Sequence, residues 1–276
     1  NQVVGQTCTK PSKIEIMHYG YSVDDKKANE KYIRTTELLK KQIAEDPDNP
    51  KPHHYLSASY MSHALFRDCI AEAEKAVELA EKIGDEHSLY LWSRHNAAMS
   101  YYYLGDMENA RRHALRTLEK FDGHMDSYHV LTLVSAEQDD WNAVLRYGEK
   151  YLERLTFYEA QSDKAGVLIN MTMKEGAMVC LLTGYAWCKT GHKPRMMDCY
   201  RKAEVLADEP WQSWYNAAVY HMDKTQDYAE SKTLLYKAIH LAPEEQSVWY
   251  SLAKLGFLSK DRLSELSWLM KLQQAG

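Results

Sequence analysis

The stretch LSASYMSHALFRDCIAEAEKA, residues 56–76, sets the pattern for the whole chain. It reads as two short helices joined by a turn, with large apolar side chains at offsets of three, four and seven and small residues between them. Small side chains where two helices cross allow close approach, while the larger ones line one face. A single pair of helices cannot bury such a face alone, so the pattern predicts that further pairs stack on this one.

The same pattern returns along the chain at a nearly fixed spacing. One position late in each unit marks the register of the repeat. It is occupied in successive units by Gln42, Ala76, Thr117, Tyr151, Ala203 and Ala238. The successive steps of 34, 41, 34, 52 and 35 residues describe a period of 34 with insertions of 7, 18 and 1. A fixed period in this range is the signature of a helical repeat array.

The repeat resembles the tetratricopeptide repeat (TPR), whose first helix carries W-x-x-L-G-x-x-Y and whose second carries A-x-x-x-F-x-x-A followed by Pro. The matching residues are Trp214 with Ala217 and Ala218, Leu56 with Tyr60, Tyr128 with Leu131, Trp249 with Leu252 and Ala253, and the closing Pro47 and Pro243. The resemblance covers roughly residues 28–258 and implies an all-α fold. That fold is an α-solenoid, a right-handed superhelix of antiparallel helix pairs, with about six repeats. We assign residues 28–276 to this domain and expect residues 261–272 to form a capping helix.

Two insertions interrupt the period. Residues 82–88 lengthen one link by seven residues, and eighteen more lie between Thr156 and Ala177. The apolar residues of the second insertion, near 157–174, are too numerous for a solvated loop. We therefore expect two longer helices there, forming a projecting hairpin.

Composition narrows the class of protein. Hydrophobic residues make up 45% of the chain and charged residues 26%, which is the balance of a soluble folded protein. The formal charge of −5 argues against a nucleic-acid partner, and no apolar run is long enough to span a membrane. The five cysteines include no C-x-x-C pair, which favours reduced thiols and a cytoplasmic location. The start lacks a signal core and an initiator Met, which favours an excised fragment over a processed product.

The N-terminal segment 1–27 carries a second pattern. Ile14-Glu15-Ile16 alternates like a short strand and leads into Met17-His18-Tyr19-Gly20-Tyr21, and a lysine-rich helix follows. The stretch 14–49 resembles the junction in bacterial family-2 glycosyltransferases that carry TPR repeats after their catalytic domain. The resemblance implies a parent enzyme that transfers sugar from a nucleotide sugar with a divalent metal, Mn or Mg. By that resemblance His18 is a metal ligand, and its imidazole suits Mn²⁺ better than Mg²⁺.

The chain itself lacks the other parts of such an enzyme. No nucleotide-binding α/β domain precedes the motif, and Thr35-Thr36 after Arg34 departs from the Arg-Asn expected in the family. The single D-x-D triplet, residues 46–48, falls in a repeat turn. Nucleophile elbows, Walker loops and G-x-G-x-x-G motifs are absent from the sequence. We therefore expect no catalytic residue and no cofactor in this chain.

In a TPR stack the first helices line the concave groove, with positions 2, 5, 9 and 12 pointing into it. These positions give the groove candidates His54, Met61, His95, Met99, Tyr102, His129, Leu133, Tyr185, Tyr215 and Met222. The three histidines share position 5 and predict a weakly polar, pH-sensitive wall. The competing interpretation places most of the aromatic side chains in the core of the repeats.

Two function hypotheses follow. The first is a non-catalytic TPR region of a bacterial glycosyltransferase, which docks acceptor or partner proteins. The second is a free-standing TPR adaptor that binds peptides or assembles a complex. Methionine and aromatic side chains in the groove favour a protein or peptide partner, or a sugar stacked on an aromatic ring. Self-association is a further partner hypothesis.

Overall fold

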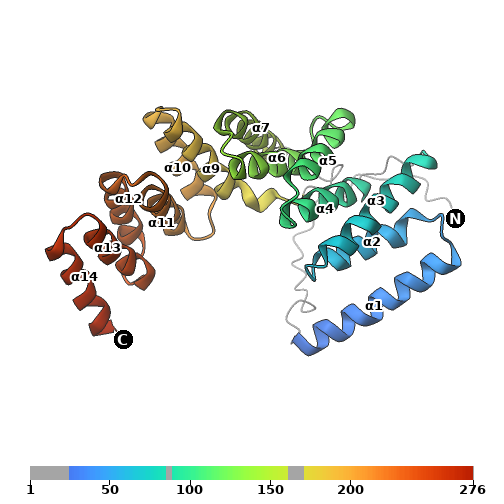
Figure 1. Cartoon of the computed structure of the whole chain (residues 1–276), viewed down its shortest axis with the longest axis horizontal. Helices are drawn as coiled ribbons and strands as arrows, with labels where there is room; N and C mark the ends of the chain where they lie inside the picture. The colour runs from blue at the N-terminus through green and yellow to red at the C-terminus, as the bar shows by residue number, and fades with distance from the viewer. Residues whose placement is uncertain (1–24, 85–88, 161–170, 276) are drawn as a thin grey trace.

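The computed structural model describes residues 25–84, 89–160 and 171–275, and every regular element in these ranges is a helix. The helices follow one another around an open arch, with the first and last described helices on opposite arms (Figure 1). The predicted all-α solenoid is confirmed. The expected strand remnant at residues 14–16 and His18 lie outside the described residues. Among the described helices, none is long and apolar enough to cross a bilayer.

After a long opening helix the chain forms six antiparallel pairs. The opening helix is α1 (Asp25–Glu45), the second helix of an incomplete first repeat. The pairs are α2 (Pro50–Met61) with α3 (Phe66–Lys82), α4 (Leu89–Tyr103) with α5 (Met107–Lys120), α6 (Met125–Glu137) with α7 (Trp141–Ala160), α9 (Gly176–Lys189) with α10 (Lys193–Leu206), α11 (Pro210–Tyr220) with α12 (Tyr228–Leu241), and α13 (Gln246–Leu258) with α14 (Arg262–Ala275). A π-helical turn, η3 (His221–Thr225), extends α11.

One backbone feature ends the first helix of all six pairs. A residue with φ between 55° and 80° occurs there at Ala64, Gly105, Asp139, Gly191, Gln226 and Lys260. The spacings of these residues, 41, 34, 52, 35 and 34, reproduce the period of the sequence. The next amide then bonds back into the helix: the N–H of Leu65 donates to the carbonyl of Tyr60 at 3.0 Å, as in a Schellman motif.

Aspartates that follow the left-handed residue start the second helices. The carboxylate of Asp106 accepts from the backbone N–H of Asn109 at 3.0 Å, and Asp140 and Asp227 make the equivalent bond. Each satisfies one of the free N–H groups at a helix start. The left-handed turn and the cap together reverse the chain within about two residues, which sets the antiparallel pairing.

Small residues let the paired helices touch. At Gly184 on α9, a Cβ atom would lie 2.4 Å from the ring of Tyr200 on α10. Tyr200 is fully buried there and its hydroxyl bonds Nε2 of His221 at 3.0 Å. The buried apolar residues of the described helices form several clusters along the stack and not one central core.

The insertions and the last helix differ in part from the sequence-based expectations. Helix α7 is long, as expected, but residues 161–170 lie outside the described part and η2 (Met173–Glu175) is only a 3₁₀ turn, so the described residues show one arm of the expected hairpin. Residues 85–88 of the first insertion are likewise not described. Helix α14 packs on α13, yet Leu263 is 83% exposed and no residue of α14 is buried. It is the second member of the last pair, and its role as a capping helix stays a prediction.

Candidate functional site

The first helices of the pairs lie on the inner side of the arch (Figure 1). α2 packs on α4, α4 on α6, α6 on α9, and α9 on α11, while each second helix packs mainly on the first helices at either side. Equivalent helices of a curved stack come closest on the inside of the curve. The first helices therefore line the concave face, as the repeat pattern indicates.

The structure buries half of the groove candidates. His54 has no exposed surface, His129 is 4% exposed and Tyr185 9% exposed. Met99 and Met222 are buried as well. His54 lies among the rings of Tyr55, Tyr90 and Trp92, and its Nδ1 bonds the Ser93 hydroxyl of the next first helix at 2.8 Å. His54 and Tyr185 join neighbouring repeats in this arrangement, and the role of all five side chains as partner contacts stays a prediction.

The other five candidates keep part of their surface in solvent. These half-buried residues are Met61, His95, Tyr102, Leu133 and Tyr215. The Tyr102 hydroxyl donates to Glu137 at 3.2 Å, and that of Tyr215 accepts from Ser251 at 3.4 Å. Both bonds reach the next first helix. These phenols therefore tie repeats together while part of each ring stays open to solvent.

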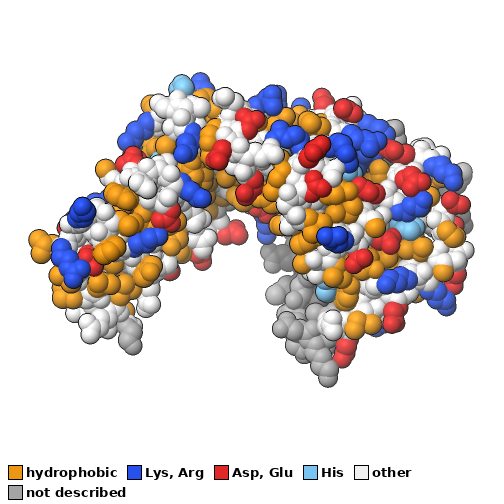
Figure 2. Space-filling model, viewed as in Figure 1, with side chains coloured by type: hydrophobic (Ala, Val, Ile, Leu, Met, Phe, Trp, Pro, Cys, Tyr) orange, Lys and Arg blue, Asp and Glu red, His pale blue; other side chains and the backbone are white. Residues whose placement is uncertain are grey.

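Two further residues of the inner face were not among the predicted groove candidates. Tyr250 and Phe257 follow Tyr215 and Met222 by 35 residues, so they occupy positions 5 and 12 of α13. No first helix follows α13 in the described residues, and these rings are 62% and 66% exposed. The sequence could have predicted Tyr250 as a groove residue, because the Trp249-Tyr250 pair repeats Trp214-Tyr215. Hydrophobic side chains gather over this C-terminal arm in the space-filling view (Figure 2).

An aromatic stack joins α9 to α11. The rings of Tyr185 and Tyr220 are parallel, at 4°, with their centroids 3.7 Å apart. The Tyr185 hydroxyl donates to the carbonyl of Asn216 at 3.3 Å. Tyr220 was not among the candidates, because it occupies position 10 of α11, which is not one of the positions expected to point into the groove.

A buried polar cluster lies between α4, α6 and the residues that precede α9. Asp126 has no exposed surface and accepts hydrogen bonds from Met171 N at 2.8 Å, Thr172 N at 3.0 Å and the Thr172 hydroxyl at 2.6 Å. His124 Nε2 lies 3.8 Å from the same carboxylate, and its Nδ1 bonds the Ser127 hydroxyl at 2.8 Å. Asp126 therefore holds the end of the long insertion against α6.

Burial governs the titration of these histidines. It lowers the pKa of His129 to about 3 and that of His54 to about 4. It also lowers the pKa of His95 and His124, although the nearby Asp126 carboxylate opposes this change in both. Both ring nitrogens of His129 lack a hydrogen-bond partner in the described structure. The predicted pH-sensitive row is therefore an interior feature at two of its three positions.

Among the described residues, no side chains are arranged as a catalytic or metal-binding site. Among them, no group of three His, Cys, Asp or Glu side chains is placed to hold a metal ion. The four described cysteines are free thiols, and burial raises the pKa of Cys180 to about 12 and that of Cys199 to about 11. Such thiols are poor nucleophiles at neutral pH. What the inner face presents is apolar and aromatic surface.

Comparisons with known proteins agree with this arrangement. No family model and no curated protein matches the sequence. Among solved structures, the C-terminal part of a TPR repeat-containing protein from Cytophaga hutchinsonii is 13% identical, with a TM-score of 0.59 over 89% of this chain and 90% of that one. YrrB, described as a TPR protein with an unusual peptide-binding site, is 15% identical, with a TM-score of 0.52 over 78% of this chain and 98% of that one.

A third structure contains the APC/C assembly Cut9-Hcn1. It is 14% identical, with a TM-score of 0.57, and the match covers 82% of this chain and 40% of the other chain.

The fold is that of a TPR solenoid. At position 12 of the first helices most side chains keep some surface in solvent: Met61, Tyr102, Ala136 and Cys188 are half-buried and Phe257 is exposed, whereas Met222 is buried. A strip of mainly apolar surface thus follows the inner face from α2 to α13.

Proposed function

We propose that the chain is a non-catalytic TPR scaffold that binds a peptide or protein segment along its concave face. The observation that carries this proposal is the inner strip at position 12, which ends in the exposed ring of Phe257, together with the exposed ring of Tyr250 at position 5 of the same helix. Exposed aromatic and methionine side chains in a concave, otherwise packed surface are typical of anchor points for a partner. The peptide-binding site named for YrrB supports the same class of partner.

The geometry favours a ligand with apolar side chains spaced along the strip. The walls of the groove are helices whose backbone groups are already paired, so recognition relies on side chains and not on strand addition. Tyr and Phe offer large contact areas at a low cost in side-chain entropy. We expect Tyr250, Phe257 and Tyr102 to contribute most of the binding energy.

Peptide selection tests this function without knowledge of the natural partner. A random 12-residue library displayed on phage is selected against the whole chain, and the affinities of chosen peptides are measured by fluorescence anisotropy. The double variant Tyr250→Ala/Phe257→Ala is expected to bind them about tenfold more weakly or worse, because it removes the two most exposed anchors. Its thermal unfolding should change little, because both rings are mostly exposed.

The matched control lies on the outer helix α12. Tyr236 and Leu241 are 46% and 45% exposed. The variant Tyr236→Ala/Leu241→Ala therefore also removes two large, partly exposed apolar side chains, one aromatic and one aliphatic. This control is expected to bind the selected peptides as the wild type does. If both double variants weaken binding equally, or neither does, the concave strip is not the binding site.

We also propose, on the sequence pattern of residues 14–21, that this scaffold belongs to a bacterial family-2 glycosyltransferase whose acceptor or partner it docks. In that parent, His18 would ligate the divalent metal of a nucleotide-sugar site. The segment lies outside the described residues, and the structural neighbours support the scaffold role without this parentage. A free-standing adaptor is the alternative.

The coding sequence upstream of Asn1 decides between the two. About 200 residues of alternating strands and helices with a D-x-D motif would support the glycosyltransferase. A reading frame that opens close to Asn1 would support the free-standing adaptor.

A further inference from the structure

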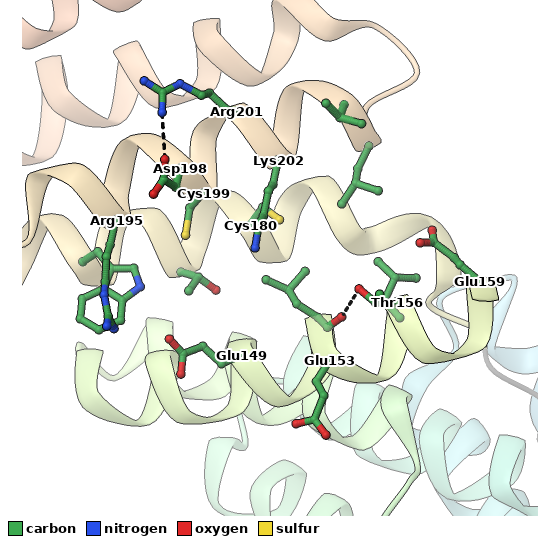
Figure 3. A pocket seen from close by; sticks show the side chains of 16 residues that line it. Glu149, Glu153, Thr156, Glu159, Cys180, Arg195, Asp198, Cys199, Arg201 and Lys202 are labelled. Carbon is green, nitrogen blue, oxygen red and sulfur yellow. Dashed lines mark hydrogen bonds and ion pairs between the residues drawn. The ribbon is translucent and has the colours of Figure 1, made fainter. Parts of the chain in front are cut away.

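The outer surface of the arch carries a cleft of about 770 Å³ between the second helices α7 and α10. It lies where the eighteen-residue insertion interrupts the period, and α9 forms its floor (Figure 3). It is separate from the concave strip, because the second helices lie on the opposite side of the stack. Any ligand here would be additional to the one proposed above.

The two walls of the cleft carry opposite charge. The α7 wall presents Glu149, Glu153 and Glu159, whereas the α10 wall presents Arg195, Arg201 and Lys202 beside one acidic residue, Asp198. Lys202 extends from α10 toward α7 in the close-up view (Figure 3). Between the charged rims the lining is apolar, and it includes Leu152, Leu155, Trp187 and Leu206. From the α7 wall to the α10 wall, the lining of the cleft therefore changes from acidic through apolar to mainly basic side chains.

The equivalent gap between α3 and α5 shows what a closed version looks like. There the acidic wall is paired with the basic one: His113 Nε2 lies 3.1 Å from the Glu74 carboxylate, and Lys120 Nζ lies 2.7 Å from that of Glu81. Arg94 also pairs with Glu81. The cavity that remains is about 370 Å³. Across this gap the Glu81 carboxylate is paired with Lys120 and Arg94, and the Glu74 carboxylate contacts the His113 imidazole, all within the chain.

In the α7–α10 cleft the charges are not paired across the gap. Glu149 stands at the repeat position of Glu74, 75 residues later, yet among the described residues no ion pair joins α7 to α10. Glu153 pairs instead with Lys150 at 2.8 Å, within α7, and Arg201 with Asp198 at 2.8 Å, within α10. Glu149 and Lys202 remain exposed and available to a partner.

We propose that this cleft binds an amphipathic helix of a partner protein, with a basic edge against α7 and an acidic edge against α10. The apolar face of that helix enters between Leu152, Leu155 and Leu206. A helix is favoured because the walls are themselves helices with no free backbone groups, so an extended peptide would find no strand to pair with. A helix satisfies its own backbone and packs against α7 and α10 as they pack on α9.

Three designed 18-residue helical peptides test the proposal. All carry the same leucine face; the first has lysine on one edge and glutamate on the other, the second lysine on both edges, and the third glutamate on both. The wild-type chain is expected to bind the mixed peptide about tenfold more tightly than either uniform one, because each uniform peptide sets like charges against one wall. The difference should shrink at high salt.

Charge reversal of one wall supplies the decisive variant. Lys202→Glu makes both rims acidic at this level, so it is expected to prefer the peptide with two lysine edges over the mixed peptide. Lys41→Glu changes the net charge equally on the exposed surface of α1 and should leave the wild-type order unchanged. An unchanged order in Lys202→Glu, or no binding of any of the three peptides, overturns the proposal.

Thiol protection locates the bound helix. Cys199 lines the cleft, whereas Cys188 is a half-buried thiol at an inner-face position and serves as the internal reference. Because burial raises the pKa of Cys199 to about 11, its reaction with iodoacetamide is followed at pH 9 over hours; the mixed peptide is expected to slow this reaction about tenfold, read by mass spectrometry, and to leave Cys188 unaffected. Protection of Cys188 in place of Cys199 would put the peptide in the concave groove and contradict the proposal without affecting the proposed function.

Discussion

At the scale of single residues, Asp126 explains how a repeat array tolerates its longest insertion. Its carboxylate receives three hydrogen bonds from Met171 and Thr172, 45 and 46 residues further along the chain. Nothing in the sequence pattern singles out Asp126, because an acidic residue in the first turn of a helix usually needs no partner beyond the helix end. Its importance follows from the path of the insertion, which a repeat pattern does not contain.

Replacing Asp126 should loosen this attachment. Asp126→Asn is expected to lower the free energy of unfolding by about 2–4 kcal/mol, because an amide NH₂ would face donors that the carboxylate now accepts. Amide exchange of Met171 and Thr172 should quicken more than that of α4. Urea unfolding and hydrogen exchange measure both effects.

The exposed Asp198 provides the control. It pairs with Arg201 on the same helix, with both side chains more than 60% exposed, so Asp198→Asn should change the stability by less than about 0.5 kcal/mol. Equal effects of the two substitutions would show that the buried hydrogen bonds of Asp126 do not hold the insertion.

The buried histidines predict that mild acid destabilises the chain. Burial places the folded-state pKa of His129 at about 3 and that of His54 at about 4, below the ordinary value of 6.5 in the unfolded chain. Between these values the unfolded state binds more protons, so stability is complete above about pH 6.5 and falls as the pH is lowered toward 4. The lowered pKa of Asp126 adds a loss only below its ordinary value of 3.8. Urea midpoints at pH 7.5 and pH 5 measure the change.

A glutamine at position 129 separates this effect from general acid sensitivity. His129→Gln is expected to reduce the difference between the two urea midpoints, whatever its effect on stability at pH 7.5. Replacing the exposed His192 in the same way should leave that difference intact. Identical midpoints for the wild type at the two pH values would contradict the account of the buried histidines.

At the scale of the helices, the turn within each pair was more predictable than the rotation of each helix. The spacing of the left-handed residues equals the spacing of the sequence pattern, since both reflect one local motif. The exposure of position 5 was not predictable, because it depends on the next first helix: His54 is covered by α4, while Tyr250, which no described first helix follows, is 62% exposed. The sequence pattern names the inner face but does not determine how tightly neighbouring helices close over it.

The residue with a left-handed backbone conformation in each turn provides a test of the turn motif, because substitutions there act mainly on the backbone conformation. Gly105 has a φ of 79° and a Cβ there would meet no atom within 4 Å, so Gly105→Ala is expected to cost about 1 kcal/mol through conformational strain alone. The converse change at the equivalent position, Ala64→Gly, should raise stability by a similar or smaller amount. Thermal unfolding measures both, and shifts of the same sign would contradict a shared turn motif.

At the scale of the whole molecule, the arch presents two surfaces with different chemistry. The inner strip is apolar and aromatic, and the outer cleft between α7 and α10 is apolar with charged rims of opposite sign. The period of 34 predicted the solenoid and the inner face. It could not predict the cleft, because a cleft between second helices depends on which charges pair across the gap.

We propose above that the stacked helix pairs hold a partner along the concave face. A crystal structure of the chain with a peptide selected from the 12-residue library shows where the partner lies. We expect an open arch with the peptide lying along the first helices, in contact with Phe257 or Tyr250 or, further along, with Tyr102. Helices closed into a bundle without a trough, or a peptide seated only on the second helices, would contradict it.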